Sequence, residues 1–337
     1  MPSAFVTGAS GFVGANLVRA LLERGWRVRA LVRGAAPSLD GLDVERVPGD
    51  LFSARLPDAM DGCDAVFHLA ATYSLWRRDR DELFRVNVEG TRAVLAAARR
   101  AGVPRVVHTS SVAAIGVRGD GAPADELHQT PPDALIGAYK RSKYFAEAAA
   151  RRAVDDGQDV VIVNPSTPVG PWDARPTPTG EIVLRFLAGR MPAYVDTGLN
   201  LVDVRDVAAG HILAFERGRA GERYILGNRN LSLRELLAEL AAVAQRPAPR
   251  VRLPRILPLA YAALGEFVLA PLGVPADVPV ESVRMAGQRM YYDPGKAVRE
   301  LGLPQSPVSR ALADAVGWFR THPTFSEDRW PSLSSKP

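Results

Sequence analysis

Three glycines at intervals of three residues, Gly8, Gly11 and Gly14, stand between a short apolar segment and an amphipathic one. The segment Ala4–Thr7 has the length and apolar content of a buried strand, and Asn16–Arg24 places leucines on one face of a helix. Between a strand and a helix, such glycines permit a tight turn and let a phosphate group approach the helix N-terminus. This feature predicts that the chain folds around a nucleotide-binding turn.

The alternation of strand and helix continues through the first half of the chain. Apolar, β-branched runs are separated by segments long enough for helices, among them one from about 81 to 101 and one that begins near 139. Such runs indicate parallel strands joined by right-handed crossovers. We therefore predict the α/β class, a doubly wound parallel sheet of the Rossmann type, with further strands at Arg27–Val32, Val44–Val47, Ala65–Leu69, Val106–Thr109 and Val160–Val163.

The pattern changes after Asn164. Prolines and glycines crowd residues 165–178, and helical patterns follow at 181–188, 204–216, 232–244 and 311–320. The C-terminal third has no sheet pattern of its own. We expect a dinucleotide-binding core over 1–164 and a smaller, mostly helical substrate-binding subdomain over 165–325, with some return to the core over about 199–227. Residues 326–337 have the composition of a flexible tail.

Composition excludes several classes of function. The 337 residues carry a net charge of +5, and the single cysteine, Cys63, excludes an internal disulfide and is typical of a reducing, cytoplasmic location. Basic residues are spread as isolated pairs, so we expect no nucleic-acid partner, and no cluster has metal-ligand spacing. No apolar stretch is long enough for a transmembrane span. The most apolar segment, Ile256–Leu272, indicates a buried or lid helix, with peripheral contact to a membrane surface as the alternative.

The end of the second predicted strand bears on which nucleotide binds. Folds that prefer NAD place a carboxylate there, on the ribose 2′-hydroxyl. Here the strand ends in Leu-Val-Arg33-Gly, and Arg33 is placed to pair with a 2′-phosphate, with Arg29 or Arg27 as helpers. A solvated arginine is the alternative. Because the carboxylate is missing and a base is present, NADP(H) is favoured over NAD(H).

A tyrosine and a lysine lie one helical turn apart at Tyr139 and Lys143. A nearby ammonium stabilises a phenolate and lowers the tyrosine pKa, which would make Tyr139 usable as an acid or base near neutral pH. Ser110 and Ser111 follow the fifth strand, at the edge where a doubly wound sheet binds its ligands. A surface Tyr–Lys contact is the alternative, and the serines argue against it.

Together these motifs resemble the extended short-chain dehydrogenase/reductases of the NAD-dependent epimerase/dehydratase family over about residues 3–320. The resemblance implies Tyr139 as acid or base, Lys143 lowering its pKa and holding the nicotinamide ribose, Ser111 orienting the substrate oxygen, and Asn87 supporting the hydrogen-bond chain. The residues expected to contact the nucleotide are Gly8, Ser10, Gly11, Phe12, Val13, Gly14, Arg33, Asp50, Leu51, Leu69, Ala70, Ala71, Thr109, Lys143, Pro165 and Thr167.

Five segments resemble one branch more closely: Tyr73–Trp76, Tyr139–Lys143, Asn164–Pro171, Met191–Gly198 and Gly221–Gly227. That branch is the hopanoid-associated sugar epimerases, and the same loops also resemble dihydroflavonol-reductase-like and steroid-dehydrogenase-like enzymes. The expected function is hydride transfer at a carbinol or carbonyl carbon. Epimerisation, net reduction by NADPH and non-catalytic dinucleotide sensing remain open. Nucleotide-sugar enzymes usually have Arg-Pro after the sixth strand, where this chain has Asn164-Pro165, which argues against a nucleotide sugar.

The expected substrate is a small molecule with a hydroxyl or carbonyl group. Loops at the carboxyl edge of the sheet supply its expected contacts, Tyr73, Trp76, Ser111 and Tyr194. The resemblance also implies a homodimer, formed through two long helices at about 81–101 and 139–153, both with alanine-rich faces.

Overall fold

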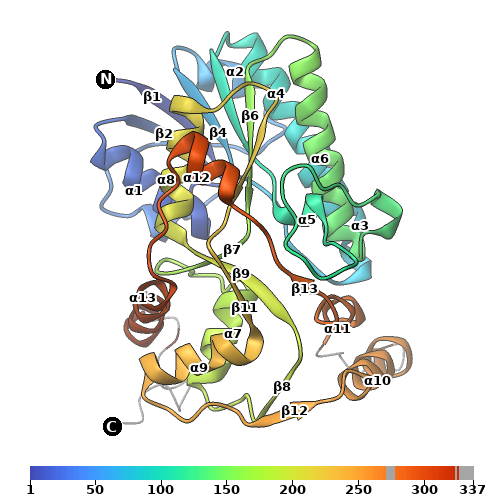
Figure 1. Ribbon diagram of the computed structural model, residues 1–337. Coiled ribbons are helices and arrows are strands. Elements are labelled where there is room, and N and C mark those ends of the chain that lie inside the picture. Colours follow the sequence, from blue (N-terminus) through green and yellow to red (C-terminus); the bar gives the residue numbers. More distant parts are fainter. Residues whose placement is uncertain (271–277, 323–324, 326–337) are drawn as a thin grey trace.

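A seven-stranded parallel sheet lies at the centre of the larger part of the protein (Figure 1). The computed structural model describes residues 1–270, 278–322 and 325. The chain crosses over between β1 and β4, so the carboxyl ends of these two strands flank a switch in strand order. From one edge to the other the strands are β10 (Arg223–Leu226), β6 (Val160–Pro165), β5 (Arg105–Thr109), β4 (Ala65–His68), β1 (Ser3–Thr7), β2 (Arg27–Val32) and β3 (Glu45–Pro48).

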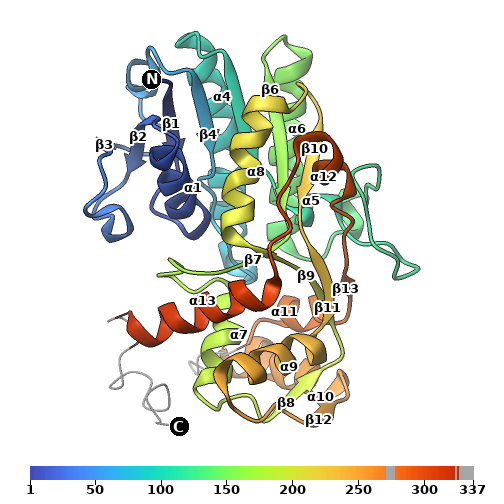
Figure 2. The ribbon, with the colours of Figure 1, turned by 60° about the vertical axis from the view of Figure 1, so that its left-hand side comes forward.

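Helices cover both faces of this sheet. On one face α1 (Phe12–Glu23) packs beside α8 (Val204–Arg217), and α12 (Gly295–Leu301) packs on α8 (Figure 2). On the other face lie α2 (Leu56–Met60), α4 (Gly90–Arg100) and α6 (Gly137–Asp155). Side chains alternate along each strand, so Val6 packs in the apolar core under α1 and α8, whereas Phe5 packs in the apolar core under α2 and α4. The predicted doubly wound α/β fold is confirmed.

Two local departures from the expected helices bear on the site. The first helix begins at Phe12, and not at Asn16, so Phe12 and Val13 lie in its first turn. The segment expected as one helix over 81–101 is α3 (Arg80–Phe84), a π-helical turn η3 (Arg85–Glu89) and then α4. Asn87 lies in that π-helical turn. Short connecting helices are η1 (Pro37–Leu39), η2 (Arg77–Asp79), η4 (Pro132–Ala134) and α5 (Val112–Ile115).

The C-terminal part contains strands that the sequence analysis did not predict. One small sheet has β9 (Gly198–Asp203) between β11 (Arg229–Ser232) on one edge and both β7 (Thr167–Val169) and β13 (Arg289–Met290) on the other. A second sheet pairs β8 (Ala193–Val195) with β12 (Val251–Leu253). The prediction that this part has no strands of its own was therefore wrong. The strands were missed because segments of two to six residues leave little periodic pattern.

Helices pack on these small sheets. An apolar core joins α7 (Pro178–Leu187), α9 (Leu233–Ala244) and α13 (Val308–Thr321) to β9. At the lower right of Figure 1 lie α10 (Ile256–Leu264), a π-helical turn η5 (Gly265–Leu269) and α11 (Val280–Met285). Of the two expectations for Ile256–Leu272, a buried helix is wrong, since Ala262 is the buried residue of α10 and its other residues are partly or fully exposed; the lid helix stays a prediction, and residues 271 and 272 lie outside the described part. The predicted flexible tail at 326–337 lies outside the described residues.

The described part of the chain holds no helix long and apolar enough to cross a membrane.

A buried ion pair links β10, an edge strand of the large sheet, to helix α6. The Arg223 guanidinium on β10 and the Glu147 carboxylate on α6 lie 2.9 Å apart, and both side chains are buried. Arg223 also donates to the carbonyl oxygens of Glu126 and His128 in the loop before α6. The interactions of this one side chain therefore hold a sheet edge, a helix and a long loop together.

Replacing Arg223 by methionine should destabilise the protein strongly. The Arg223→Met substitution leaves the Glu147 carboxylate buried without its buried counter-charge, so the free energy of unfolding should fall by about 3 to 5 kcal/mol. Urea unfolding followed by circular dichroism measures this change. The matched control is Arg229→Met, which breaks a more exposed ion pair with Glu239 and should change stability by about 0 to 1 kcal/mol. Equal effects of the two substitutions would contradict the argument.

Candidate active site

The glycine turn lies at the carboxyl end of β1, where it contacts the chain that leaves β4. Gly8 has φ +70°, and a Cβ on it would lie 2.6 Å from the backbone nitrogen of Ala70. A Cβ on Gly14 would collide with the carbonyl oxygen of Gly8, and the Gly11 N–H donates to that oxygen at 3.0 Å. Glycine is therefore required at positions 8 and 14 by the closeness of backbone to backbone.

The start of α1 fits the pyrophosphate of a dinucleotide. In the described part of the chain, Gly11 stands at the N-cap position and no side chain caps this helix. The first N–H groups of α1 therefore point past the glycine turn without a side-chain acceptor, and the helix dipole adds positive potential there. Ser10, Phe12 and Val13 lie in the turn and in the first turn of the helix, where the sequence analysis expected nucleotide contacts.

The arginines of β2 have different roles. Arg33 is exposed just beyond the carboxyl end of the strand, on the same edge of the sheet as the glycine turn. Arg29 donates to Glu45 and to the carbonyl oxygen of Asp61, so its guanidinium is engaged within the protein. Arg27 is the first residue of β2, so it lies at the amino ends of the strands, opposite to the glycine turn. Neither Arg27 nor Arg29 can help Arg33 with a 2′-phosphate, and that part of the expectation is wrong.

The remaining residues expected at the nucleotide follow the carboxyl ends of β3, β4, β5 and β6. Asp50 is exposed and accepts from the backbone N–H of Phe52, whereas Leu51 is buried against Gly90 of α4. Leu69, Ala70 and Ala71 follow β4, Thr109 ends β5, Pro165 ends β6 and Thr167 begins β7. The loop after β7 is tied to α1, because the Asn16 side chain donates to the carbonyl oxygen of Pro171 at 3.0 Å.

Tyr139 and Lys143 lie on the first turns of α6. Lys143 is buried and its Nζ donates to the carbonyl oxygen of Thr109 at 2.8 Å. Burial lowers the pKa of Lys143 to about 8, partly opposed by the negative charge of Glu147. The pKa of Tyr139 is raised by burial, with a hydrogen bond to the Ser111 side chain acting in the opposite direction. Burial thus acts against the lowering of the Tyr139 pKa that the sequence analysis expected from Lys143.

The two serines after β5 face different partners. The Ser110 hydroxyl donates to the buried Glu147 carboxylate at 2.7 Å. Ser111 caps α5, accepts from the backbone N–H of Ala113 at 3.1 Å, and is the serine that hydrogen-bonds Tyr139. Asn164 at the end of β6 donates both to Glu147 and to the Ser111 carbonyl oxygen. Ser111, and not Ser110, is thus the hydroxyl directed at Tyr139.

Glu147 is a site residue that the sequence analysis missed. Burial raises its pKa, but the charge of Arg223 and the hydrogen bonds from Ser110 and Asn164 outweigh burial, so its pKa lies below the usual value. Glu147 lies one turn beyond Lys143 on α6, and this spacing was the available signal. A carboxylate on a helix face that also carries Tyr139 and Lys143 points to the sheet, where it needs buried partners.

A second hydrogen-bond chain supports the loop after β4. Asn87 accepts from the backbone N–H of Thr72 at 2.8 Å and donates to the Thr72 carbonyl oxygen and to the Ser142 hydroxyl. Ser142 in turn donates to the Tyr139 carbonyl oxygen at 2.8 Å. Asn87 thus positions both the loop and the start of α6, and its side chain is buried.

The structure places the expected substrate contacts in two separate regions. The ring of Tyr73 lies edge-on to that of Tyr139, with centroids 4.6 Å apart. Trp76 follows in the same loop, partly buried, with the Arg78 guanidinium 5.2 Å from its ring centroid. Tyr194 lies on β8, at the other end of the C-terminal part beside β12, and packs against the apolar core there (Figure 1). The structure therefore brings Tyr73 to Tyr139 and assigns Tyr194 a packing role.

Comparison with known proteins gives one family. The model of the NAD dependent epimerase/dehydratase family matches residues 4–227. A protein of Synechocystis sp. named as dihydroflavonol 4-reductase-like is 59% identical over 324 residues, which cover 94% of each chain. Sterol demethylase protein B of Methylococcus capsulatus is 42% identical over 321 residues, which cover 94% of this chain and 97% of that one.

Solved structures agree in fold. The crystal structure of gox2253 is 42% identical and superposes with a TM-score of 0.86, covering 97% of this chain and 100% of that chain. The dTDP-glucose 4,6-dehydratase DesIV from Streptomyces venezuelae, solved with NAD bound, is 26% identical with a TM-score of 0.75, covering 98% and 100% of the two chains. The chain is therefore similar over nearly its whole length to enzymes that use a nicotinamide dinucleotide.

A methyl group at Gly14 should impair nucleotide binding. In Gly14→Ala the new Cβ overlaps the Gly8 carbonyl oxygen, so α1 must move away from the turn. The Kd for NADH or NADPH, whichever the wild type binds, should rise by about tenfold or more in isothermal titration calorimetry. Circular dichroism of the same sample reports whether the fold survives. The control is Gly317→Ala on α13, where nothing lies within 4 Å of the new Cβ. An unchanged Kd in a folded Gly14→Ala variant would contradict the assignment.

Proposed function

We propose that this chain, which belongs to the NAD dependent epimerase/dehydratase family, uses NADPH to reduce a carbonyl group of a small molecule, with Tyr139 as the proton donor. The observation that carries the proposal is the position of Tyr139. Its phenol meets the Ser111 hydroxyl at the carboxyl edge of the sheet, and Lys143 follows one turn further along α6. A phenol in this position can transfer its proton to a substrate oxygen that the Ser111 hydroxyl holds.

The side chains then have distinct roles. When bound, the nicotinamide supplies the hydride to the carbonyl carbon. Ser111 donates a hydrogen bond to the substrate oxygen, and Tyr139 transfers its proton to that oxygen as negative charge develops on it. Lys143, one turn along α6, contributes the positive charge that stabilises the phenolate left behind. The product is an alcohol, and Tyr139 regains its proton from solvent before the next turnover.

Epimerisation would use the same groups in a different order. Its first step is oxidation of a carbinol, for which Tyr139 must begin as the base. Asn164 stands where nucleotide-sugar enzymes usually have arginine, which argues against a nucleotide sugar as the substrate. The name of the dihydroflavonol 4-reductase-like relative favours net reduction.

Three further expectations accompany this proposal. Residues 1–164 form the dinucleotide-binding core, and residues 165–325 form the subdomain that completes the substrate site, with some return to the core over about 199–227. The enzyme works in the cytoplasm, in keeping with its single buried thiol at Cys63. Two copies meet through α4 and α6, whose outer faces expose Ala96, Ala148 and the ring of Phe145.

Removal of the Tyr139 hydroxyl should abolish reduction and spare nucleotide binding. With Tyr139→Phe, kcat for NADPH oxidation in the presence of aromatic and alicyclic ketones should fall by about 10²- to 10⁴-fold, because no proton donor remains. The Kd for NADPH should change little. The matched control is Tyr144→Phe on the same helix, which should retain full turnover. Equal turnover of Tyr139→Phe and the wild type would refute the assigned role.

Replacing Arg33 by alanine should weaken NADPH and leave NADH nearly unaffected. A charge-assisted hydrogen bond to the 2′-phosphate contributes about 1.5 to 3 kcal/mol, so Kd for NADPH should rise by about 10- to 100-fold in Arg33→Ala. Arg27→Ala, at the opposite end of β2, is the control. Mass spectrometry of nucleotide released on denaturation gives a second test. Stoichiometric NAD would contradict the NADPH proposal and favour epimerisation.

A further inference from the structure

An exposed apolar surface runs along α10 and η5. Most of a helical face here is open to solvent, with side chains between 48% and 69% exposed at helical spacing over about four turns. We call this surface the apolar stripe, and its residues are Ile256, Leu257, Tyr261, Leu264, Phe267 and Val268. Contiguous exposed apolar residues of this number mark an interaction site, because leaving them in water is unfavourable.

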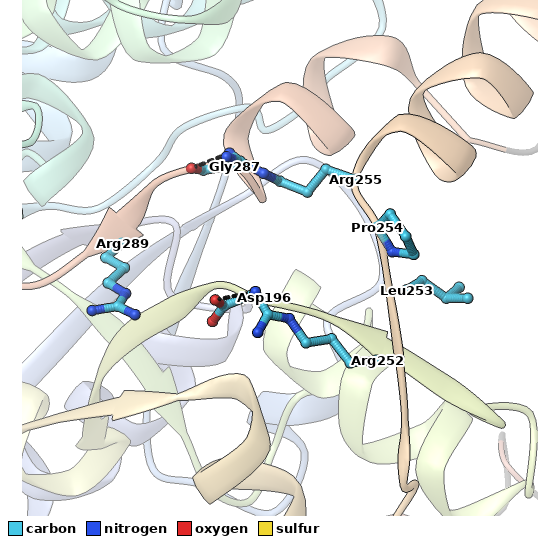
Figure 3. A pocket seen from close by; sticks show the side chains of 7 residues that line it. All are labelled: Asp196, Arg252, Leu253, Pro254, Arg255, Gly287 and Arg289. Carbon is cyan, nitrogen blue, oxygen red and sulfur yellow. Dashed lines mark hydrogen bonds and ion pairs between the residues drawn. The ribbon is translucent and has the colours of Figure 1, made fainter.

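A basic pocket adjoins the N-terminal end of the same helix. Three arginines line it against a single carboxylate, that of Asp196 (Figure 3). Arg252 on β12 donates to Asp196 at 2.8 Å, Arg255 at the start of α10 donates to the Gly287 carbonyl oxygen, and Arg289 on β13 is exposed. One carboxylate cannot neutralise three guanidinium groups, so the pocket carries net positive charge. The helix dipole of α10 adds to the positive potential at that end.

The combination of these two features selects one partner. We propose that the apolar stripe and the adjoining arginine pocket dock this protein on an anionic phospholipid bilayer. The stripe enters the boundary between headgroups and acyl chains, and the arginines bind the headgroup phosphates. A second protein chain would need a patch of carboxylates at one end of the stripe to match these arginines, whereas an anionic bilayer presents phosphates along its whole surface. The charge complementarity therefore favours the bilayer.

The docking surface is connected to the active site through α11. The Glu266 carboxylate in η5 accepts from the backbone N–H of Val280 at the start of α11 at 2.8 Å. Glu281 in α11 accepts from the backbone N–H of Ala138, next to Tyr139. A protein docked by α10 would therefore hold its catalytic helix one short helix away from the bilayer surface.

Flotation with vesicles tests the proposal. The full chain is mixed with vesicles of phosphatidylcholine alone or of phosphatidylcholine with phosphatidylglycerol, and the bound fraction is measured after density-gradient centrifugation. Binding should be about tenfold stronger to the anionic vesicles and should weaken as salt is raised. The double substitution Leu257→Glu and Phe267→Glu should abolish it, and Arg289→Gln should weaken it on anionic vesicles.

Matched controls separate this surface from general effects. Leu127→Glu changes an apolar residue that is 91% exposed elsewhere, and Arg100→Gln removes an exposed charge from α4; both variants should bind like the wild type. Circular dichroism confirms that each variant is folded. Failure of the wild type to float with anionic vesicles would overturn the proposal. So would a dimer, detected by sedimentation velocity, that only the Leu257→Glu and Phe267→Glu substitutions dissociate, because the stripe would then bind a second copy.

Discussion

The geometry of the active site depends on one buried carboxylate. Glu147 of α6 accepts from Ser110 after β5, from Asn164 at the end of β6 and from Arg223 on β10. These contacts come from three strands, so they fix how far along its axis α6 lies relative to the sheet. Because Tyr139 lies on the same helix, its distance from the serine loop is fixed as well. A charge buried in this way tolerates no missing partner, which makes the arrangement specific even where its net stabilisation is small.

The hydrogen-bond network around His68 is uncharged, which avoids repulsion between a charged imidazole and the nearby Lys143 ammonium. The Ala70 N–H donates to the Thr7 hydroxyl, and His68 forms hydrogen bonds to the Thr7 hydroxyl through Nδ1 and to the Thr91 hydroxyl through Nε2. Because the Thr91 hydroxyl donates to the Asn87 carbonyl oxygen, it accepts from Nε2 of His68, so Nδ1 accepts from Thr7. Burial, together with the nearby ammonium of Lys143, lowers the pKa of His68 to about 3. The imidazole is therefore neutral at any physiological pH, and its tautomer is set by hydroxyl groups that already have directions. The loop after β4 consequently keeps its shape when the ionisation of the site changes.

The sequence predicted those parts that depend on local constraints and missed those that depend on distant partners. The glycine turn was predictable because Gly14 must lie against the carbonyl oxygen of Gly8, only six residues earlier in the chain. The spacing of Tyr139 and Lys143 was predictable because a helix sets it. No local pattern encodes the ion pair of Arg29 with Glu45 or the hydrogen bonds of Glu147 to residues of three strands. Both depend on which strands lie side by side in the sheet. The packing of Tyr194 against the apolar core of the C-terminal part was not predictable for the same reason, since it depends on the pairing of the three-residue strand β8 with β12.

The approach to Tyr139 is set by two segments that differ in how they are held. On one side, the loop with Tyr73 is fixed to Asn87 through both backbone groups of Thr72. On the other side, α11 reaches the first turn of α6 through the carboxylate of Glu281, which lies at the positive end of that helix. The first segment is anchored in the nucleotide-binding core, whereas the second is joined to the exposed helix α10. Tyr139 is therefore flanked by one segment that belongs to the nucleotide-binding core and by one that belongs to the C-terminal part.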